Sequence, residues 1–151
     1  VQTRLKKLES GVAEATFLAS AGLLRLGMKG LVNSISPDVM MPAIAQGVIG
    51  VQQRTNDYQM TSLLSPLNDK DTEIQVLVER TFLNILDGSC RTPIGAHTRL
   101  KGSNIFFRGE VLRVDGSEVV SGSWDGFTSD PVELGQRAGR DLKEKIGDSF
   151  F

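Results

Sequence analysis

Cys90 is the only cysteine of the chain, and it lies among residues that would leave its sulfur accessible. Gly88 and Ser89 before it are small, and Arg91 follows it directly. A neighbouring guanidinium favours the thiolate, which is the nucleophilic form of cysteine. Cys90 is therefore a candidate nucleophile, but composition alone favours a free cysteine that only packs. His97, the single histidine, follows seven residues later across a proline, and this spacing does not establish a catalytic pair.

Two arginines near one apolar segment form a candidate anion site. Arg4 falls in a predicted short helix before the apolar run 15–19, and Arg25 falls in a predicted helix after it. Ligands of α/β sheets bind at the carboxyl ends of strands, and the planar guanidinium suits carboxylate or phosphate. The alternative is that both arginines are simply solvated, which is the better interpretation unless something else supports a site.

The other glycines and polar residues do not form a recognised binding or catalytic motif. Gly47 and Gly50 do not have the spacing of a phosphate-binding loop. Asp69, Asp71 and Glu73 are most simply charges at the start of a helix, where they suit its dipole. One cysteine and one histidine argue against a disulfide framework and against a zinc or histidine-based metal site.

The overall composition excludes several classes of protein. The 151 residues include 17 Lys and Arg against 18 Asp and Glu, which gives a formal net charge of -1 and no electrostatic footprint for nucleic acid. No apolar stretch approaches the roughly 20 residues that a membrane-spanning helix needs. Hydrophobic residues make up 40% and charged residues 23%, an ordinary globular mixture. We therefore expect neither a nucleic-acid partner nor a membrane association.

The first forty residues have the pattern of an α/β fold. Leu5 and Leu8 give one face of a short helix, and the run 15–19 has the length of a strand buried on both faces of a parallel sheet. Residues 23–26 then predict a short helix that Gly27 ends. A strand, a turn of small residues and a helix make half of a βαβ unit.

From Asn68 onward the pattern predicts a small α+β domain. Asn68 or Asp69 can cap a helix with one apolar face, formed by Ile74, Leu77, Val78, Thr81, Phe82, Ile85 and Leu86. Three strands of one antiparallel sheet are predicted at 96–100, 105–114 and 118–124, with a helix before them and a helix after them.

The end of the chain predicts one more helix. Asp130 stands at its N-cap, Pro131 at its first position and Glu133 three residues after the cap. Phe150 and Phe151 close the sequence, and an apolar end of this kind should dock on the domain.

Five ordered motifs resemble one enzyme family. They are Thr3-Arg4-Leu5-x-Lys7-Leu8, Leu18-Ala-x-Ala-Gly-Leu-x-Arg25-Leu-Gly27, Pro42-Ala-x-x-Gln46-Gly-x-x-Gly50, Glu79-Arg80-x-Phe82-Leu83 and Gly88-Ser89-Cys90-x-Thr92-Pro93-Ile94. Together they resemble the porphobilinogen deaminases, also called hydroxymethylbilane synthases. The resemblance runs from end to end of the chain, and the loop around Cys90 is its most specific part.

The resemblance implies a transferase of heme and chlorophyll biosynthesis, located in the cytoplasm or the plastid stroma. Such enzymes join four porphobilinogen molecules into linear hydroxymethylbilane and release ammonia at each step. They build the product on a dipyrromethane cofactor, and the resemblance assigns its thioether link to Cys90. It further implies that Arg4 and Arg25 hold acetate and propionate groups, that Gln46 lines the same cleft, and that Ala19 offers a backbone contact to the cofactor.

The resemblance covers only the C-terminal half of the family's length, and Leu24 stands where the family commonly has lysine. It implies that residues 1–42 end a second, periplasmic-binding-protein-like α/β domain. Residues 43–66 would return to the first domain, and residues 67–151 would form the third, cofactor-cysteine domain. The catalytic aspartate belongs to the part that is absent here, so the chain alone is expected to be inactive.

The same resemblance implies a monomeric full-length enzyme. Residues 67–151 should fold independently, whereas residues 1–66 should not hold the family fold alone. This chain is therefore expected either to dimerise or to need the N-terminal part. Two non-catalytic alternatives are a carboxylate-binding module that uses Arg4 and Arg25, and an assembly domain. Neither alternative explains the loop around Cys90.

Overall fold

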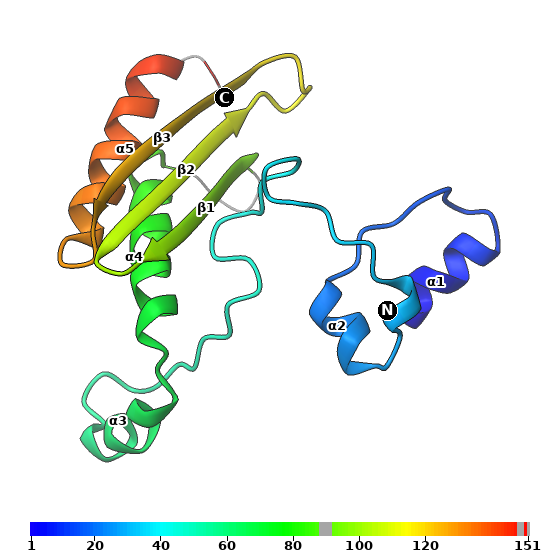
Figure 1. The fold of residues 1–151 in the computed structure, drawn as a ribbon, viewed down its shortest axis with the longest axis horizontal. Coiled ribbons are helices and arrows are strands. Elements are labelled where there is room, and N and C mark those ends of the chain that lie inside the picture. Colours follow the sequence, from blue (N-terminus) through cyan, green and yellow to red (C-terminus); the bar gives the residue numbers. More distant parts are fainter. Residues whose placement is uncertain (88–91, 148–149, 151) are drawn as a thin grey trace. The chain divides into compact units, whose positions relative to one another are not determined.

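The computed structural model describes residues 1–87, 92–147 and 150 of the chain. The chain divides into two compact units, Val1–Val39 and Met40–Phe151, and each has its own set of elements (Figure 1). Within the described residues, no helix is both long enough and apolar enough to cross a membrane.

The first unit consists of short helices joined by irregular segments. These are α1 (Gln2–Glu9), α2 (Ser20–Arg25) and the 3₁₀ helix η1 (Lys29–Leu31). Among residues 1–39, all of which are described, only Leu23 of α2 is buried. The unit therefore lacks a hydrophobic core of its own, although both predicted helices form.

The strand predicted at 15–19 was wrong, because this segment is irregular and Phe17 is 67% exposed. A strand needs a neighbour to bond its backbone groups, and residues 1–39 contain no other strand. The following helix begins at Ser20, three residues earlier than predicted. It ends before Gly27, whose φ of +73° is the left-handed conformation that glycine adopts without strain.

The second unit begins with a long connecting segment that leads into two short helices. The helices are α3 (Tyr58–Leu64) and the 3₁₀ helix η2 (Ser65–Leu67). Neither was predicted, because their sequence has no clear helical periodicity. Instead, α3 begins where the Asp57 side chain accepts a hydrogen bond from the Met60 backbone N–H.

The rest of the second unit is an antiparallel sheet covered on one face by two helices (Figure 1). The elements in order are α4 (Lys70–Ile85), β1 (Ile94–Lys101), β2 (Asn104–Leu112), β3 (Val119–Phe127) and α5 (Pro131–Ile146). The strand order is β1-β2-β3, so β1 and β3 are the edges. The predicted α+β domain with a three-stranded antiparallel sheet is thereby confirmed.

The core lies between the sheet and the two helices. Its buried residues include Val78, Phe82, Leu86, Ile94, Ala96, Ile105, Phe107, Val111, Leu134, Ala138 and Leu142. At its centre the rings of Phe82 and Phe107 meet edge to face, with centroids 5.1 Å apart. Gly109 makes room for the Phe82 ring, since a β-carbon there would lie 2.6 Å from Cζ of Phe82.

The cap of α4 forms as predicted, whereas the cap of α5 differs in detail. The Asp69 side chain accepts a hydrogen bond of 2.8 Å from the Thr72 backbone N–H. Asp130 holds the N-cap position of α5 without a side-chain capping bond, because its carboxylate accepts from Ser129 Oγ instead. Its backbone carbonyl still accepts from the Leu134 N–H, so Pro131 starts the helix as expected.

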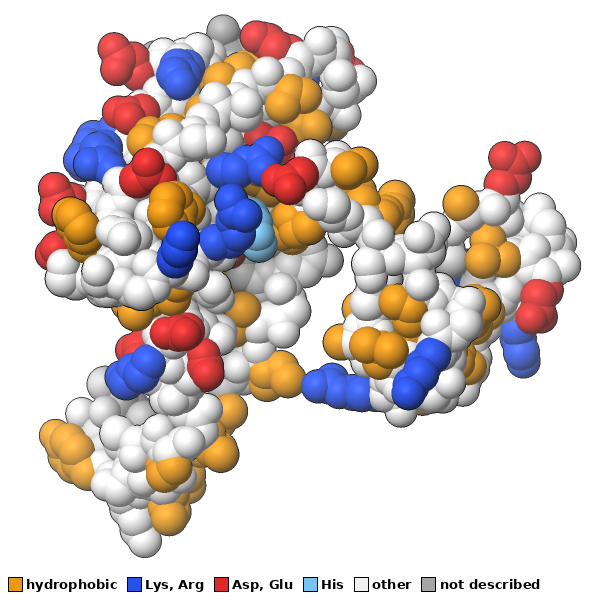
Figure 2. Space-filling view, in the orientation of Figure 1, with side chains coloured by type: hydrophobic (Ala, Val, Ile, Leu, Met, Phe, Trp, Pro, Cys, Tyr) orange, Lys and Arg blue, Asp and Glu red, His pale blue; other side chains and the backbone are white. Residues whose placement is uncertain are grey.

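The outer face of the sheet carries charged side chains of both signs (Figure 2). His97 of β1 is half-buried there and pairs across the ladder with Arg108 of β2. This placement is that of an ordinary polar residue on a strand.

Candidate functional site

Cys90 lies outside the described residues, but the two elements that lead to it and away from it are described. Helix α4 ends at Ile85, and Asp87 follows in the left-handed conformation with φ of +52°. Lys143 of α5 donates to the Asp87 carboxylate at 2.6 Å and to the Ile85 carbonyl at 3.2 Å. A lysine at this position satisfies a free carbonyl of the helix end and fixes the departure of the chain from α4.

On the other side of Cys90, the chain returns directly into the sheet. The Ile94 N–H donates to the Thr92 carbonyl at 2.8 Å, and the Leu112 N–H of β2 donates to the Pro93 carbonyl at 2.9 Å. The segment that bears Cys90 is therefore short and has both ends bonded to regular structure.

Arg4 extends from α1 toward the segment that precedes α2. Its Nη1 lies 3.5 Å from Thr16 Oγ1 and 3.5 Å from the Phe17 carbonyl. Both distances are at the long limit for hydrogen bonds, so these contacts are weak. Because a guanidinium has five N–H donors, an exposed Arg4 retains ample capacity to bind an anion.

Ala19 and Arg25 mark the two ends of α2. Ala19 is the N-cap residue, and its carbonyl accepts from the N–H groups of Gly22 and Leu23 at 3.0 and 3.2 Å. Arg25 occupies the last turn and is exposed. A helix rise of about 1.5 Å per residue puts the two backbones about 9 Å apart. Arg4, Ala19 and Arg25 thus belong to one small unit, although no hydrogen bond or ion pair within residues 1–39 joins the arginines.

Gln46 belongs to the second unit and closes a tight turn. Its backbone N–H donates to the Ala43 carbonyl at 3.1 Å, while its Oε1 accepts from the Ala43 N–H at 3.0 Å. The side-chain carbonyl is thereby engaged within the turn. The group that Gln46 can present to a ligand is its Nε2 amide, since the residue is exposed.

One contact of this turn was missed by sequence reasoning. The N–H of Ala45 donates to Glu79 Oε2 of α4 at 2.8 Å, across 34 positions of sequence. A glutamate on a helix ordinarily faces solvent, but Glu79 lies next to Val78 and three positions before Phe82, both of which are buried. The position of Glu79 beside this apolar face was the one signal in the sequence for its burial.

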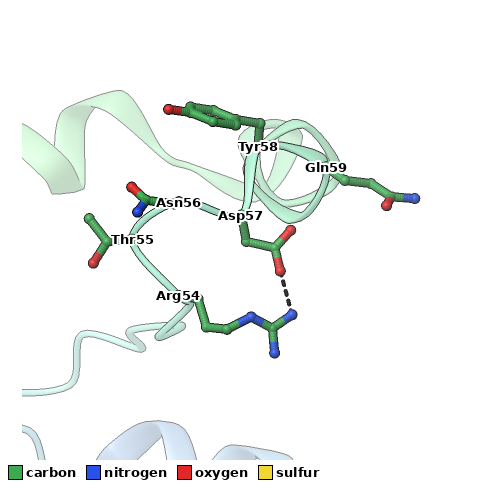
Figure 3. A pocket seen from close by; sticks show the side chains of 6 residues that line it. All are labelled: Arg54, Thr55, Asn56, Asp57, Tyr58 and Gln59. Carbon is green, nitrogen blue, oxygen red and sulfur yellow. Dashed lines mark hydrogen bonds and ion pairs between the residues drawn. The ribbon is translucent and has the colours of Figure 1, made fainter.

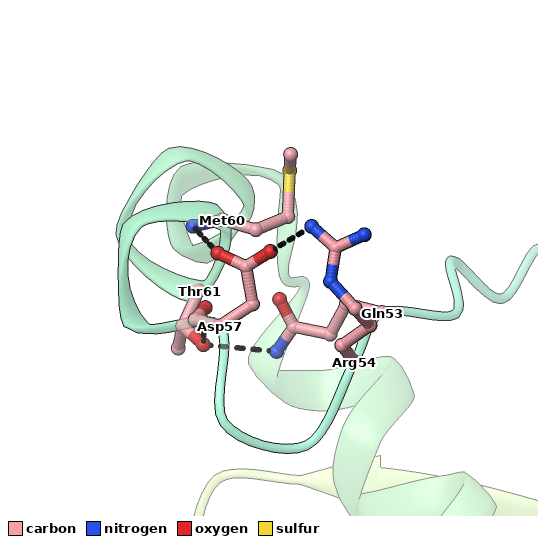
Figure 4. A network of polar contacts seen from close by, with 5 residues as sticks. All are labelled: Gln53, Arg54, Asp57, Met60 and Thr61. Carbon is pink, nitrogen blue, oxygen red and sulfur yellow. Dashed lines mark hydrogen bonds and ion pairs between the residues drawn. The ribbon is translucent and has the colours of Figure 1, made fainter.

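A shallow hollow at residues 54–59 is a turn that starts α3 (Figure 3). Asp57 accepts from the Met60 N–H at 3.0 Å and pairs with Arg54 at 2.5 Å. These two contacts, the backbone one foremost, lower the pKa of Asp57. Gln53 adds a bond from its Nε2 to Thr61 Oγ1 (Figure 4). The polar groups satisfy one another, so they build the helix start rather than a ligand site.

A larger groove lies between the connecting segment and α3 to α4. Its apolar lining includes Val48, Ile49, Val51, Leu64, Leu67, Val76 and Leu77. Ile49 is 78% exposed, and hydrophobic side chains gather around α3 in Figure 2. Within the described part of the chain, no cluster of three His, Cys, Asp or Glu residues could hold a metal ion.

Two family models match the chain in succession. Residues 1–62 match the porphobilinogen deaminase dipyromethane cofactor binding domain, and residues 73–144 match the porphobilinogen deaminase C-terminal domain. The chain belongs to the porphobilinogen deaminase family. The resemblance found in the five motifs is thereby confirmed.

Several curated porphobilinogen deaminases are similar over the whole chain. The protein of Paracoccus denitrificans is 48% identical over 152 residues, and that of Nitrobacter hamburgensis is 42% identical. The chloroplastic porphobilinogen deaminase of Oryza sativa is 49% identical over 155 residues. All of this chain is covered in each case, but only 49%, 48% and 43% of the respective relatives. The chain therefore spans about half the length of the curated relatives it matches.

The match to the porphobilinogen deaminase cofactor-binding domain includes four of the predicted site residues: Arg4, Ala19, Arg25 and Gln46. Cys90 falls within the match to the C-terminal domain. The roles of these five residues remain predictions, because the family models match segments rather than individual contacts.

Proposed function

We propose that this chain forms the C-terminal half of a hydroxymethylbilane synthase, a transferase of tetrapyrrole biosynthesis. The complete enzyme would join four porphobilinogen molecules into linear hydroxymethylbilane and release ammonia. The observation that carries this proposal is the succession of two porphobilinogen deaminase domains in one chain. The names of the bacterial and chloroplastic relatives support a place in the bacterial cytoplasm or the plastid stroma.

The donors of the first unit fit a dipyrromethane, whose pyrroles carry acetate and propionate groups. Arg4 and Arg25 are exposed guanidinium groups on α1 and α2, and each can bind a carboxylate through two parallel hydrogen bonds. The contacts of Arg4 at 3.5 Å are weak enough to exchange for a carboxylate at little cost. When bound, the dipyrromethane supplies the primer on which the product is built.

Cys90 would hold the cofactor through its sulfur. The segment between α4 and β1 is anchored at Asp87 by Lys143 and at Pro93 by the Leu112 N–H. The residues that directly precede Cys90 in the sequence, Gly88 and Ser89, are small, which suits a cysteine that must accept a bulky group. A thiolate favoured by the neighbouring arginine is the nucleophile that a thioether requires.

The proposed domain organisation assigns residues 1–42 to a second, periplasmic-binding-protein-like domain and residues 43–66 to a segment that returns to a first domain. Residues 67–151 would be the third domain. Exposed apolar residues support this organisation, because Phe17 and Ile49 leave hydrophobic surface that further chain would cover. The chain alone would lack the catalytic aspartate of the first domain. We propose that it is inactive until it is joined to an N-terminal half that contains this aspartate.

A chimera tests the proposal. The N-terminal half of the Paracoccus denitrificans enzyme is joined to this chain, and both cofactor attachment and porphobilinogen consumption are measured. We expect added mass on the peptide that contains Cys90, together with turnover. The Cys90→Ser chimera should show neither, and this chain alone should show no turnover.

A folded chimera without added mass on the Cys90 peptide would overturn the proposed cofactor link, and turnover by the chain alone would overturn the proposed inactivity. The intact Paracoccus enzyme serves as the positive control for the assay. A chimera that binds porphobilinogen without consuming it would instead support the non-catalytic carboxylate-binding alternative.

A further inference from the structure

Glu79 is a buried carboxylate with both oxygens engaged. The residue is only 9% exposed, and it lies midway along α4. Its Oε1 accepts from Thr98 Oγ1 of β1 at 3.0 Å, and its Oε2 accepts from the Ala45 N–H at 2.8 Å. Burial of a carboxylate is costly unless hydrogen bonds replace its water. The two hydrogen bonds therefore compensate for the loss of water around the buried Glu79 carboxylate.

The segment that Glu79 binds pairs with the first residues of the edge strand β1. The Ala96 N–H of β1 donates to the Pro42 carbonyl at 2.9 Å, and Ala43 forms an antiparallel bridge with Gly95. Because β1 is an edge strand, this side of it would otherwise expose unpaired backbone groups. The side chain of Ile44 packs against the core of the same domain. Residues 42–46, which we name the edge segment, thus belong structurally to the sheet.

The edge segment contains a backbone conformation that needs support. Ala45 has φ of +52°, in the left-handed region that a residue with a β-carbon adopts only rarely. Such conformations persist where surrounding contacts determine them, and the bond from the Ala45 N–H to Glu79 is a contact of this kind. This conformation directly precedes Gln46 and sets the direction in which Gln46 leaves the turn.

We infer that Glu79 is a positioning residue that fixes the edge segment on β1 and thereby fixes Gln46 relative to the sheet. The cleft role of Gln46 rests on the proposed function, whereas the attachment of the edge segment does not. Glu79 does not touch the ligand itself, because it is buried and both its oxygens are occupied. Gln46 consequently moves with the domain that holds β1, the strand that follows the Cys90 segment.

Amide hydrogen exchange on this chain tests the attachment without any assumption about function. In the unsubstituted chain, the Ala45 N–H should be protected to a degree similar to the Ala96 N–H of β1. Glu79→Gln replaces a charged acceptor with an amide that offers only one oxygen, so the edge segment should exchange about tenfold faster or more. The amides of 105–111 in the core should keep their protection.

The matched control is Glu73→Gln in the same helix. Glu73 is exposed and accepts from Lys70 and Asn68, so this variant should leave exchange of the edge segment unchanged. An unprotected Ala45 N–H in the unsubstituted chain would overturn the inference even if Glu79→Gln failed to fold. Unchanged exchange in a folded Glu79→Gln variant would overturn it as well.

The functional consequence is measured in the chimera. Glu79→Gln and Gln46→Ala should each lower kcat/KM, and the double variant should lose little more than either alone, because both remove the same positioned amide. Fully additive losses would overturn the link between the two residues. If the unsubstituted chimera has no turnover, the proposed function fails, while the exchange experiment still decides whether Glu79 fixes the edge segment.

Discussion

Gly135 of α5 lies against Val78 of α4 so closely that a β-carbon on the glycine would sit 2.5 Å from the Val78 carbonyl oxygen. One turn later, a β-carbon on Gly139 would lie 2.6 Å from Cβ of Ile85. Two glycines at this spacing share one face of a helix, and here they bring the two helix backbones together. The packing of α4 on α5 therefore depends on the absence of side chains.

Gly135→Ala should destabilise the domain despite the better helix propensity of alanine. That propensity favours the variant by about 1 kcal/mol, but the clash is with backbone atoms that cannot move alone. Overpacking of this kind costs about 1–3 kcal/mol, so we expect a net loss in the free energy of unfolding. Urea denaturation followed by fluorescence of Trp124, the single tryptophan, measures it.

Gly50→Ala is the control, since a β-carbon there would meet nothing within 4 Å. It should change the free energy of unfolding by less than about 0.5 kcal/mol. Equal stabilities for Gly135→Ala and the unsubstituted chain would show that α4 and α5 can separate without cost, contrary to the close approach of Gly135 to the Val78 carbonyl.

Trp124 donates from Nε1 to the carboxylate of Asp141 on α5 at 2.8 Å. Asp141→Ala should cost about 0.5–1.5 kcal/mol, because the indole N–H loses its partner. Asp141→Asn retains an acceptor oxygen and should cost less. The same urea titrations compare the two variants. Equal losses would mean that the charge of Asp141, rather than its acceptor, contributes the stability.

Asp69 predicts a defined response of stability to pH. Hydrogen bonds from the backbone and side chain of Thr72 hold the pKa of Asp69 below its ordinary value of 3.8. A carboxyl with a lowered folded-state pKa contributes stability above its unfolded pKa, and loses it as pH falls through the folded pKa. The stability difference between the unsubstituted chain and Asp69→Ala should therefore be constant at neutral pH and shrink below 3.8.

The Asp69→Asn variant distinguishes the effect of the capping hydrogen bond from the effect of protonating the Asp69 carboxylate. The amide oxygen can still accept from the Thr72 N–H, but it has no carboxyl to protonate. Denaturation of all three proteins between neutral pH and about pH 3 checks this. A pH-dependent difference between Asp69→Asn and Asp69→Ala would show that another group causes the effect.

The sequence predicted the elements of the sheet domain well, because helix caps and apolar faces are determined by residues that lie close together in the sequence. The apolar face of α4, the cap at Asp69 and the Pro131 start of α5 each involve neighbouring residues. Strand ends were predicted less well, since they depend on partners. For example, β1 begins at Ile94 and not at Ala96 as predicted. The earlier start follows from pairing with β2, because the Leu112 N–H donates to the carbonyl of Pro93, the residue before Ile94.

Long-range contacts account for what sequence did not predict. The run 15–19 has strand composition, yet no other strand within residues 1–39 pairs with it. Glu79 has the sequence pattern of a solvated charge on a helix, and its burial depends on Ala45 and Thr98, from distant parts of the chain. Arg4, Ala19, Arg25 and Gln46 were named from family motifs, since spacing alone could not separate them from ordinary surface residues.

Arg4 and Arg25 are expected to bind carboxylates in the chimera. Arg4→Gln and Arg25→Gln should each lower kcat/KM for porphobilinogen about 10- to 100-fold, the loss of one charge-assisted interaction. Leu24→Lys is the control, because Leu24 is exposed and the substitution restores the residue common in the family. It should not lower activity. Unchanged kinetics in both arginine variants would support the interpretation that these arginines are merely solvated.

Phe150 docks on the sheet domain, as an apolar end was expected to do, and is only 4% exposed. The Arg113 guanidinium lies over its ring, 4.6 Å from the centroid, and donates to its carbonyl at 3.1 Å. Because the ring packs in the main core, Phe150→Ala should cost about 3–5 kcal/mol in the free energy of unfolding. Phe127→Ala removes a ring that is 62% exposed and should cost far less in the same denaturation assay. Similar losses in the two variants would mean that Phe150 adds nothing beyond a surface contact.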